Sequence, residues 1–96
     1  MNKHILLVMK WLDDKDSVSQ EELEENKRIS VAAYWADAAD AYAACAAADA
    51  AYAADYAACA ADYAACAAAD YAAYWVNKYF KETGEDKNEY VKELEK

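Results

Sequence analysis

Tyrosine, cysteine and aspartate recur with a seven-residue period between Tyr42 and Val76, and they are the side chains best able to bind or react. The repeats fit the consensus Tyr-Ala-Ala-Cys-Ala-Ala-Asp. Phenol rings beside carboxylates suit a basic, arginine-rich surface, because tyrosine gives a large contact area at a low entropic cost. The alternative interpretation is a solvated face that only keeps an alanine-rich helix soluble. The predicted binding residues are Tyr42, Asp49, Tyr52, Asp55, Tyr56, Asp62, Tyr63 and Asp70.

The residues give no sign of a catalytic or metal centre, so we expect a protein that is not an enzyme and needs no cofactor. A nucleophilic cysteine requires a neighbouring base, and the only histidine, His4, lies in the terminal segment. Cys45, Cys59 and Cys66 lack a paired histidine at the spacing of a tetrahedral zinc site. On one straight helix Cys59 and Cys66 would lie about 10 Å apart along the axis. That is too far for a disulfide, so reduced thiols are expected.

The repeat predicts a helix with two different sides. The chain has no proline and one glycine, which favours an all-α fold. At about 100° per residue, the tyrosine, cysteine and aspartate positions span an arc of about 120°, and alanine fills an opposite arc of about 160°. Alanine lets helix backbones approach closely, whereas an unpaired buried carboxylate is costly. We therefore expect alanine to face inward, and the tyrosines and aspartates to face solvent or a ligand.

Capping signals mark the ends of the predicted elements. Ser19 and Glu22 form a capping-box pattern, Gly84 suits a helix end, and Asp86 with Glu89 forms a second capping box. These signals predict one helical domain, residues 1–96, made of a short helix and loop at 1–18, an alanine-rich helical region at 19–83 and a short last helix at 86–96.

The length of the alanine-rich region leaves its path open. An uninterrupted helix from Gln20 to Thr83 would be about 95 Å long, well above ordinary globular helices. A break between residues 26 and 30, with Ser30 as a cap, is also compatible with the sequence. So is a reversal that folds the region into a hairpin or a small bundle. Trp35 and Trp75 bracket the repeat, and we expect both to anchor small cores against the terminal helices.

The charge pattern restricts the partners. The net charge is −9, and the stretch between Ile29 and Asn77 holds six aspartates without a lysine or arginine. Such a centre repels nucleic acid and anionic membranes, and recurring aspartates argue against a membrane span. Alanine buries little surface in a chain of 96 residues. We therefore expect a cytoplasmic homo-oligomer that binds neither membrane nor nucleic acid directly, and a protein partner with a basic surface.

The alanine tract and its flanks together resemble small alanine-rich proteins of tailed bacteriophages. The resemblance covers essentially the whole chain. It implies an accessory protein made in the cytoplasm of an infected bacterium, and many such proteins block host defence by binding a protein or capturing a signalling nucleotide. No functional residue is carried over, because no catalytic motif comes with this family. The flanks that carry it are Trp11-Leu12-Asp13-Asp14, Ser17-Val18-Ser19-Gln20-Glu21-Glu22-Leu23, Tyr74-Trp75-Val76-Asn77-Lys78-Tyr79-Phe80 and Thr83-Gly84-Glu85-Asp86-Lys87.

These observations favour a stoichiometric inhibitor of a bacterial defence or nucleic-acid-handling factor, in which the acidic helix face occupies a basic surface of the target. One alternative is an oligomeric sponge that holds a small signalling nucleotide between protomers, with tyrosines stacked on its bases. The acidic centre opposes this, because phosphates need cations or helix N-termini. Cations near the ends, at Lys3, Lys10, Lys27 and Arg28, could still supply them. Another alternative is a structural helical spacer without a partner.

Overall fold

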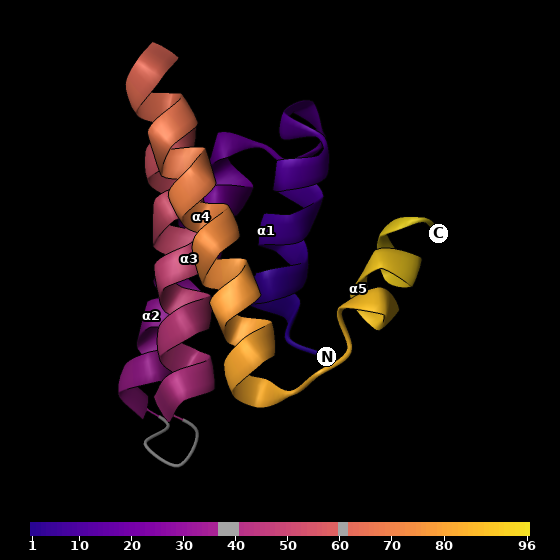
Figure 1. Ribbon diagram of the computed structural model, residues 1–96. Coiled ribbons are helices and arrows are strands. Elements are labelled where there is room, and N and C mark those ends of the chain that lie inside the picture. Colours follow the sequence, from indigo (N-terminus) through magenta and orange to yellow (C-terminus); the bar gives the residue numbers. More distant parts are fainter. Residues whose placement is uncertain (37–40, 60–61) are drawn as a thin grey trace.

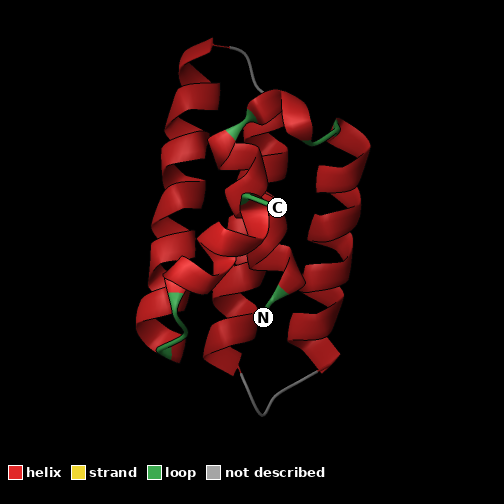
Figure 2. Cartoon of the chain, turned by 90° about the vertical axis from the view of Figure 1, so that its right-hand side faces the viewer, coloured by secondary structure: helices red, strands yellow, loops and turns green. Residues whose placement is uncertain are grey.

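The expected all-α fold is confirmed for the part of the chain that is described (Figure 2). The structure is a computed structural model that describes the backbone of residues 1–36, 41–59 and 62–96. Side chains are described for these residues except 34, 36, 41–44, 58, 59 and 62–66. The elements are α1 (Lys3–Asp13), the 3-10 turn η1 (Lys15–Ser17), α2 (Gln20–Ala36), α3 (Ala41–Cys59), α4 (Asp62–Thr83) and α5 (Lys87–Leu94).

Helices α1 to α4 run alternately up and down beside one another (Figure 1). Helix α3 packs against α1, α2 and α4, and the short α5 lies to the side and contacts α1. The largest dimension of the fold is 37 Å, so the alternative of one straight helix, about 95 Å long, is excluded. The alanine-rich region instead forms three helices that fold back on one another.

The start of α2 follows its capping box. The Glu22 amide donates to Ser19 Oγ at 3.1 Å, and the Ser19 amide donates to Glu22 Oε1 at 3.2 Å. This exchange satisfies two amides that the first helical turn leaves without partners. The alternative of a break between residues 26 and 30 is wrong, because α2 continues to Ala36. Ser30 does not cap a new helix; its hydroxyl donates to the Lys27 carbonyl within α2 at 3.0 Å.

The boundary between α4 and α5 also follows its local sequence. Gly84 has φ +73°, a left-handed conformation that favours glycine, and its amide donates to the Phe80 carbonyl at 3.0 Å. Asp86 then caps α5, because its Oδ1 accepts from the Asn88 amide at 2.9 Å. A sharp end to α4 thus directs α5 back toward the N-terminal helix (Figure 1).

Glu85, between these helices, ties α5 to the bundle. Its carboxylate accepts from the Tyr79 hydroxyl at 2.6 Å and from the Tyr90 hydroxyl, whose oxygen also accepts from the Asn2 amide at 2.7 Å. Burial, and then the hydrogen bond to Glu85, raise the pKa of both phenols, so they remain donors. Burial raises the pKa of Glu85, but the two phenol hydrogen bonds outweigh it and hold this pKa below its usual value.

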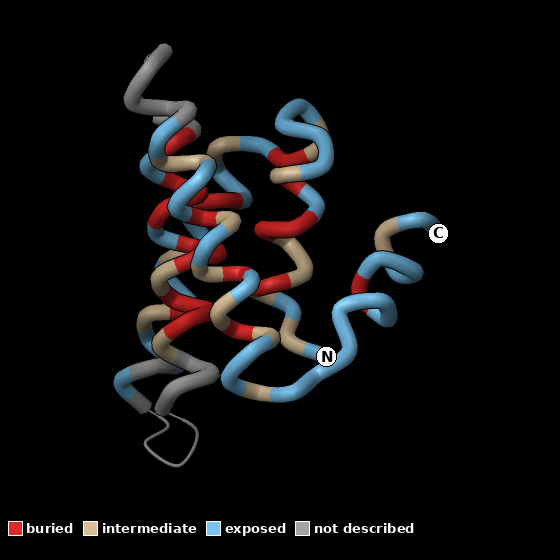
Figure 3. Tube along the Cα trace, viewed as in Figure 1, coloured by how far each residue is buried: buried red, intermediate tan, exposed pale blue. Residues whose placement is uncertain are grey.

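Alanine faces inward on α3, as the repeat predicts. Figure 3 shows how buried and exposed residues alternate along the helices. Such small side chains allow three helices to surround α3 closely. Larger apolar residues of α1, α2 and α4, among them Ile5, Leu23 and Val76, complete the same core. The buried alanines of α3 are Ala46, Ala47, Ala48, Ala50, Ala51, Ala53, Ala54 and Ala57.

The expectation that Trp35 anchors a small core is wrong, since 78% of this residue is exposed. Among the side chains of α2 that are described, the buried ones are Leu23, Asn26 and Ser30. Trp35 lies about 150° around the helix from them. Trp75 behaves as expected in part, because it is half-buried and packs against the core.

Candidate binding face

One stripe of α3 points away from the alanine core. Its members are spaced by four, three and four residues, which places them along one side of a helix. Tyr52 and Tyr56 are 59% and 55% exposed, and Cys45 and Asp49 are half-buried. This side of α3 therefore presents two phenols and a half-buried carboxylate on the part of the helix that its neighbours do not cover.

Helix α4 adds a second row of aromatic side chains. Tyr71 and Tyr74 are 56% and 53% exposed, and Asp70 beside them is also exposed. The Tyr71 ring centroid lies 6.1 Å from that of Tyr74 and 6.0 Å from that of Trp75. The Tyr74 and Trp75 rings meet edge to face at 5.4 Å. These centroid distances are those of favourable aromatic pairs, so the row is one contiguous aromatic surface.

An open groove of about 470 Å³ lies between α3 and α4. Tyr52 and Tyr56 line it from α3 and Tyr71 lines it from α4, and Asp49 is the acidic residue of the lining. We call this hollow the tyrosine groove. The rest of its lining is alanine, from Ala53, Ala67 and Ala68.

A second hollow of about 420 Å³ continues the surface along α4. It shares Ala67 and Tyr71 with the tyrosine groove, so the two form one continuous surface. Neither hollow has a lysine or arginine in its lining. We call the tyrosines and aspartates of this surface the tyrosine face: Asp49, Tyr52, Tyr56, Asp70, Tyr71 and Tyr74.

Cys45 is held as a thiol at the edge of this face. Its Sγ donates to Asp49 Oδ2 at 3.5 Å. Burial, and then the hydrogen bond and the negative charge of Asp49, raise the pKa of the Cys45 thiol. Because the thiolate is the nucleophilic form, the structure disfavours nucleophilic chemistry at this position.

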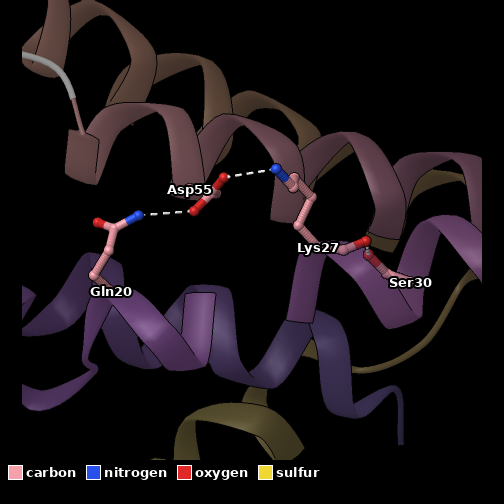
Figure 4. Close-up of polar contacts among 4 residues, drawn as sticks. All are labelled: Gln20, Lys27, Ser30 and Asp55. Atoms are coloured by element: carbon pink, nitrogen blue, oxygen red, sulfur yellow. Dashed lines mark hydrogen bonds and ion pairs between the residues drawn. The ribbon is translucent and has the colours of Figure 1, made fainter. Parts of the chain in front are cut away.

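The expectation that Asp55 faces outward is wrong, because only 7% of this residue is exposed. Figure 4 shows its carboxylate between two side chains of α2: Lys27 Nζ lies 3.0 Å from Oδ2, and Gln20 Nε2 donates to Oδ1 at 2.9 Å. Asp55 lies about 100° around α3 from Tyr56, on the side that α2 covers. The hydrogen bond and the charge of Asp55 raise the pKa of Lys27. Asp55 therefore positions α2 and is not part of the tyrosine face.

The remaining predicted residues divide into two groups. Asp49, Tyr52, Tyr56 and Asp70 are brought together on the tyrosine face. Sequence analysis missed Tyr71 and Tyr74, which follow Asp70 where the repeat shifts by one residue; their spacing of three was the available signal. The side chains of Tyr42, Asp62 and Tyr63, together with Cys59 and Cys66, lie outside the described residues.

His4 has a structural role in the described fold. Its Nδ1 lies 2.7 Å from Asn26 Oδ1, and Asn26 Nδ2 donates to the His4 carbonyl at 3.3 Å. Asn26 is buried on α2, so this paired exchange fixes α1 against α2. No group of three or more His, Cys, Asp or Glu side chains suited to a metal ion occurs among the described residues.

No protein-family model, curated protein or solved structure matches this chain. Among the helices described, none combines the length and the apolar character that crossing a membrane requires. The tyrosine face is therefore defined by the geometry and chemistry of its own residues.

Proposed function

We propose that this chain is a non-catalytic binding protein whose tyrosine face covers a basic surface of a bacterial host protein. The protein would then act as a stoichiometric, phage-type inhibitor of a defence or nucleic-acid-handling factor. The observation that supports this proposal is the continuous surface over α3 and α4, which holds two aspartates and four tyrosines that are each more than half exposed.

The composition of the tyrosine face resembles that of interface centres. Single exposed apolar side chains are ordinary on protein surfaces, but contiguous aromatic patches mark sites of interaction. Tyrosine is enriched among the residues that dominate binding energy, and arginine is its frequent counterpart. Carboxylates on the same face complement a basic partner and speed its approach. Proteins that handle nucleic acid carry such basic surfaces. A protein that covers the basic surface prevents nucleic acid from binding there.

The nucleotide sponge is the weaker proposal. Aromatic rings such as those of Tyr52, Tyr56 and Tyr71 could stack on bases. A nucleotide also carries phosphates, which need cations, and the lining of the tyrosine groove supplies only a carboxylate. The same surface that suits an arginine-rich protein thus repels a phosphate ester.

A capture experiment with charge variants tests the proposal. Tagged protein is incubated with bacterial lysate, and bound proteins are quantified by mass spectrometry at low and at moderate salt. The face variant is Asp49→Asn with Asp70→Asn. Its matched control is Glu21→Gln with Glu89→Gln, which removes the same charge from exposed positions on α2 and α5.

We expect one partner with a basic surface to be retained by the wild type and the control and to be lost from the face variant, more completely at moderate salt. Equal capture by all three proteins contradicts the proposal. Tight binding of cyclic nucleotides to the purified protein, measured by calorimetry, would favour the sponge instead.

A further inference from the structure

We propose that the tyrosine groove receives the guanidinium group of an arginine side chain from the partner. This inference rests on the proposed function and names the chemical group that the face recognises. Three observations carry it: the aromatic walls of the groove, the carboxylate in its lining, and a cation that already lies against one of its rings.

The walls have the chemistry of a cation site. Tyr52, Tyr56 and Tyr71 line one hollow from two helices. A cation near the face of an aromatic ring is attracted by the negative potential there. Lys27 Nζ already lies 5.7 Å from the centroid of the Tyr52 ring. Lys27 is paired with Asp55 at 3.0 Å and does not line the groove. The lining of the groove therefore contains no cation.

The acceptor is the Asp49 carboxylate. Its Oδ2 accepts from Cys45 Sγ, and its Oδ1 has no donor among the described residues. A guanidinium beside Asp49 would form a charge-assisted hydrogen bond, which is stronger than a neutral one. An apolar side chain in the same place would displace water from the carboxylate and offer no hydrogen bond in return. Burying the carboxylate in this way costs free energy. The groove therefore selects a cation.

Shape favours arginine over lysine. The groove volume of about 470 Å³ is that of a small-molecule site, which is roomy for a compact ammonium. A guanidinium is planar, stacks on aromatic rings and is more weakly hydrated than an ammonium. The alanine part of the lining leaves space for the methylene stem of the side chain.

The test is an NMR titration of the full chain with ring-labelled tyrosine. The probes are N-acetyl-arginine amide, the lysine amide, and the citrulline amide, which has nearly the shape of arginine without its charge. We expect arginine to shift the ring signals of Tyr52, Tyr56 and Tyr71 in a saturable way, lysine to bind more weakly, and citrulline to cause little change. The ring signal of the buried Tyr90 should stay in place and reports that the fold is intact.

Variants separate the ring from the hydroxyl. Tyr56→Phe keeps the aromatic ring and should retain most of the affinity for arginine amide. Tyr56→Ala and Asp49→Asn should each weaken it by about tenfold, which corresponds to about 1.4 kcal/mol. Trp35→Ala removes an exposed aromatic ring from α2, outside both the groove lining and the tyrosine face; it is the matched control and should leave arginine binding unchanged.

Two outcomes overturn the inference. Equal shifts with arginine and citrulline amides would show that charge is not recognised, and shifts confined to other residues would place the cation elsewhere. If arginine amide fails but partner capture is still lost from the Asp49→Asn, Asp70→Asn variant, the cation site is wrong and the proposed function stands. If both fail, the proposed function falls as well.

Discussion

At the scale of single residues, Asp55 shows how one carboxylate can position two helices. It lies on α3 among buried alanines and accepts from Lys27 and Gln20 of α2 (Figure 4). An unpaired carboxylate there would be costly, whereas this one has a donor for each oxygen. Because alanine surfaces are smooth and alike, a polar pair of this kind gives the packing of α2 on α3 a preferred register.

We predict that Asp55→Asn lowers the free energy of unfolding by about 1–2 kcal/mol, because Lys27 loses a charged partner but stays partly hydrated. Urea denaturation of Asp55→Asn, Lys27→Met and the double variant measures the coupling. The double variant should lose less stability than the sum of the single variants, by about 1 kcal/mol. Strictly additive losses would show that the ion pair contributes nothing.

At the scale of elements, the helix ends and the helix interfaces obey different rules. The residues at each helix end determine where the helix begins or stops. Ser19 caps α2, and Gly84 ends α4 with φ +73°. Both of these helix ends could be predicted from the sequence. The reversals of direction from α2 to α3 and from α3 to α4 could not, because neither glycine nor proline occurs between residues 36 and 62. The way these helices lie depends instead on the packing of α2 and α4 against α3. The same packing separates buried Asp55 from exposed Asp70, although both belong to one repeat.

The anchor of α5 predicts a pH dependence of stability. The folded pKa of Glu85 is lowered from 4.5, so its contribution is present above that pH and is lost as pH falls through the folded pKa. Glu85→Gln should lower the free energy of unfolding at pH 7 by about 1 kcal/mol. The difference from the wild type should shrink toward pH 3.

Chemical denaturation across this pH range measures both curves, with Glu89→Gln on the exposed side of α5 as the control. A constant difference between wild type and Glu85→Gln at every pH would mean that the charge of Glu85 does not matter.

The close packing of α3 is tested by enlarging one alanine. Ala54 is completely buried, whereas Ala32 on α2 is exposed. Ala54→Leu should lower the free energy of unfolding by about 1–3 kcal/mol, because a filled core has no room for added methylenes. Ala32→Leu should have little effect in the same urea denaturation experiment. A stable Ala54→Leu variant would show that the helices are not closely packed.

At the scale of the whole molecule, alanine and tyrosine occupy different places in the fold. Alanine fills the centre, and tyrosine gathers both on the tyrosine face and, through Tyr79 and Tyr90, in a buried anchor. The periodic pattern predicted the first division. It did not predict the buried tyrosines or the exposure of Trp35, because these depend on which neighbouring helix covers each side.

Self-association of the whole molecule remains a prediction, made from the small apolar area of alanine. Light scattering over a hundredfold range of concentration should show a mass above that of one chain, 10.7 kDa. A monomeric mass at every concentration would refute it. A monomer would still present the tyrosine face to a protein other than a second copy of this chain.

The outward orientation of the tyrosine face is the claim on which the proposed function depends most, and hydroxyl-radical footprinting tests it directly. In the free protein, Tyr52, Tyr56, Tyr71 and Tyr74 should be oxidised several-fold faster than the buried Tyr79 and Tyr90. Addition of the captured partner should protect the first group and leave Trp35 reactive. Slow oxidation of Tyr52 and Tyr56 in the free chain, or an unchanged pattern in the complex, would contradict the claim.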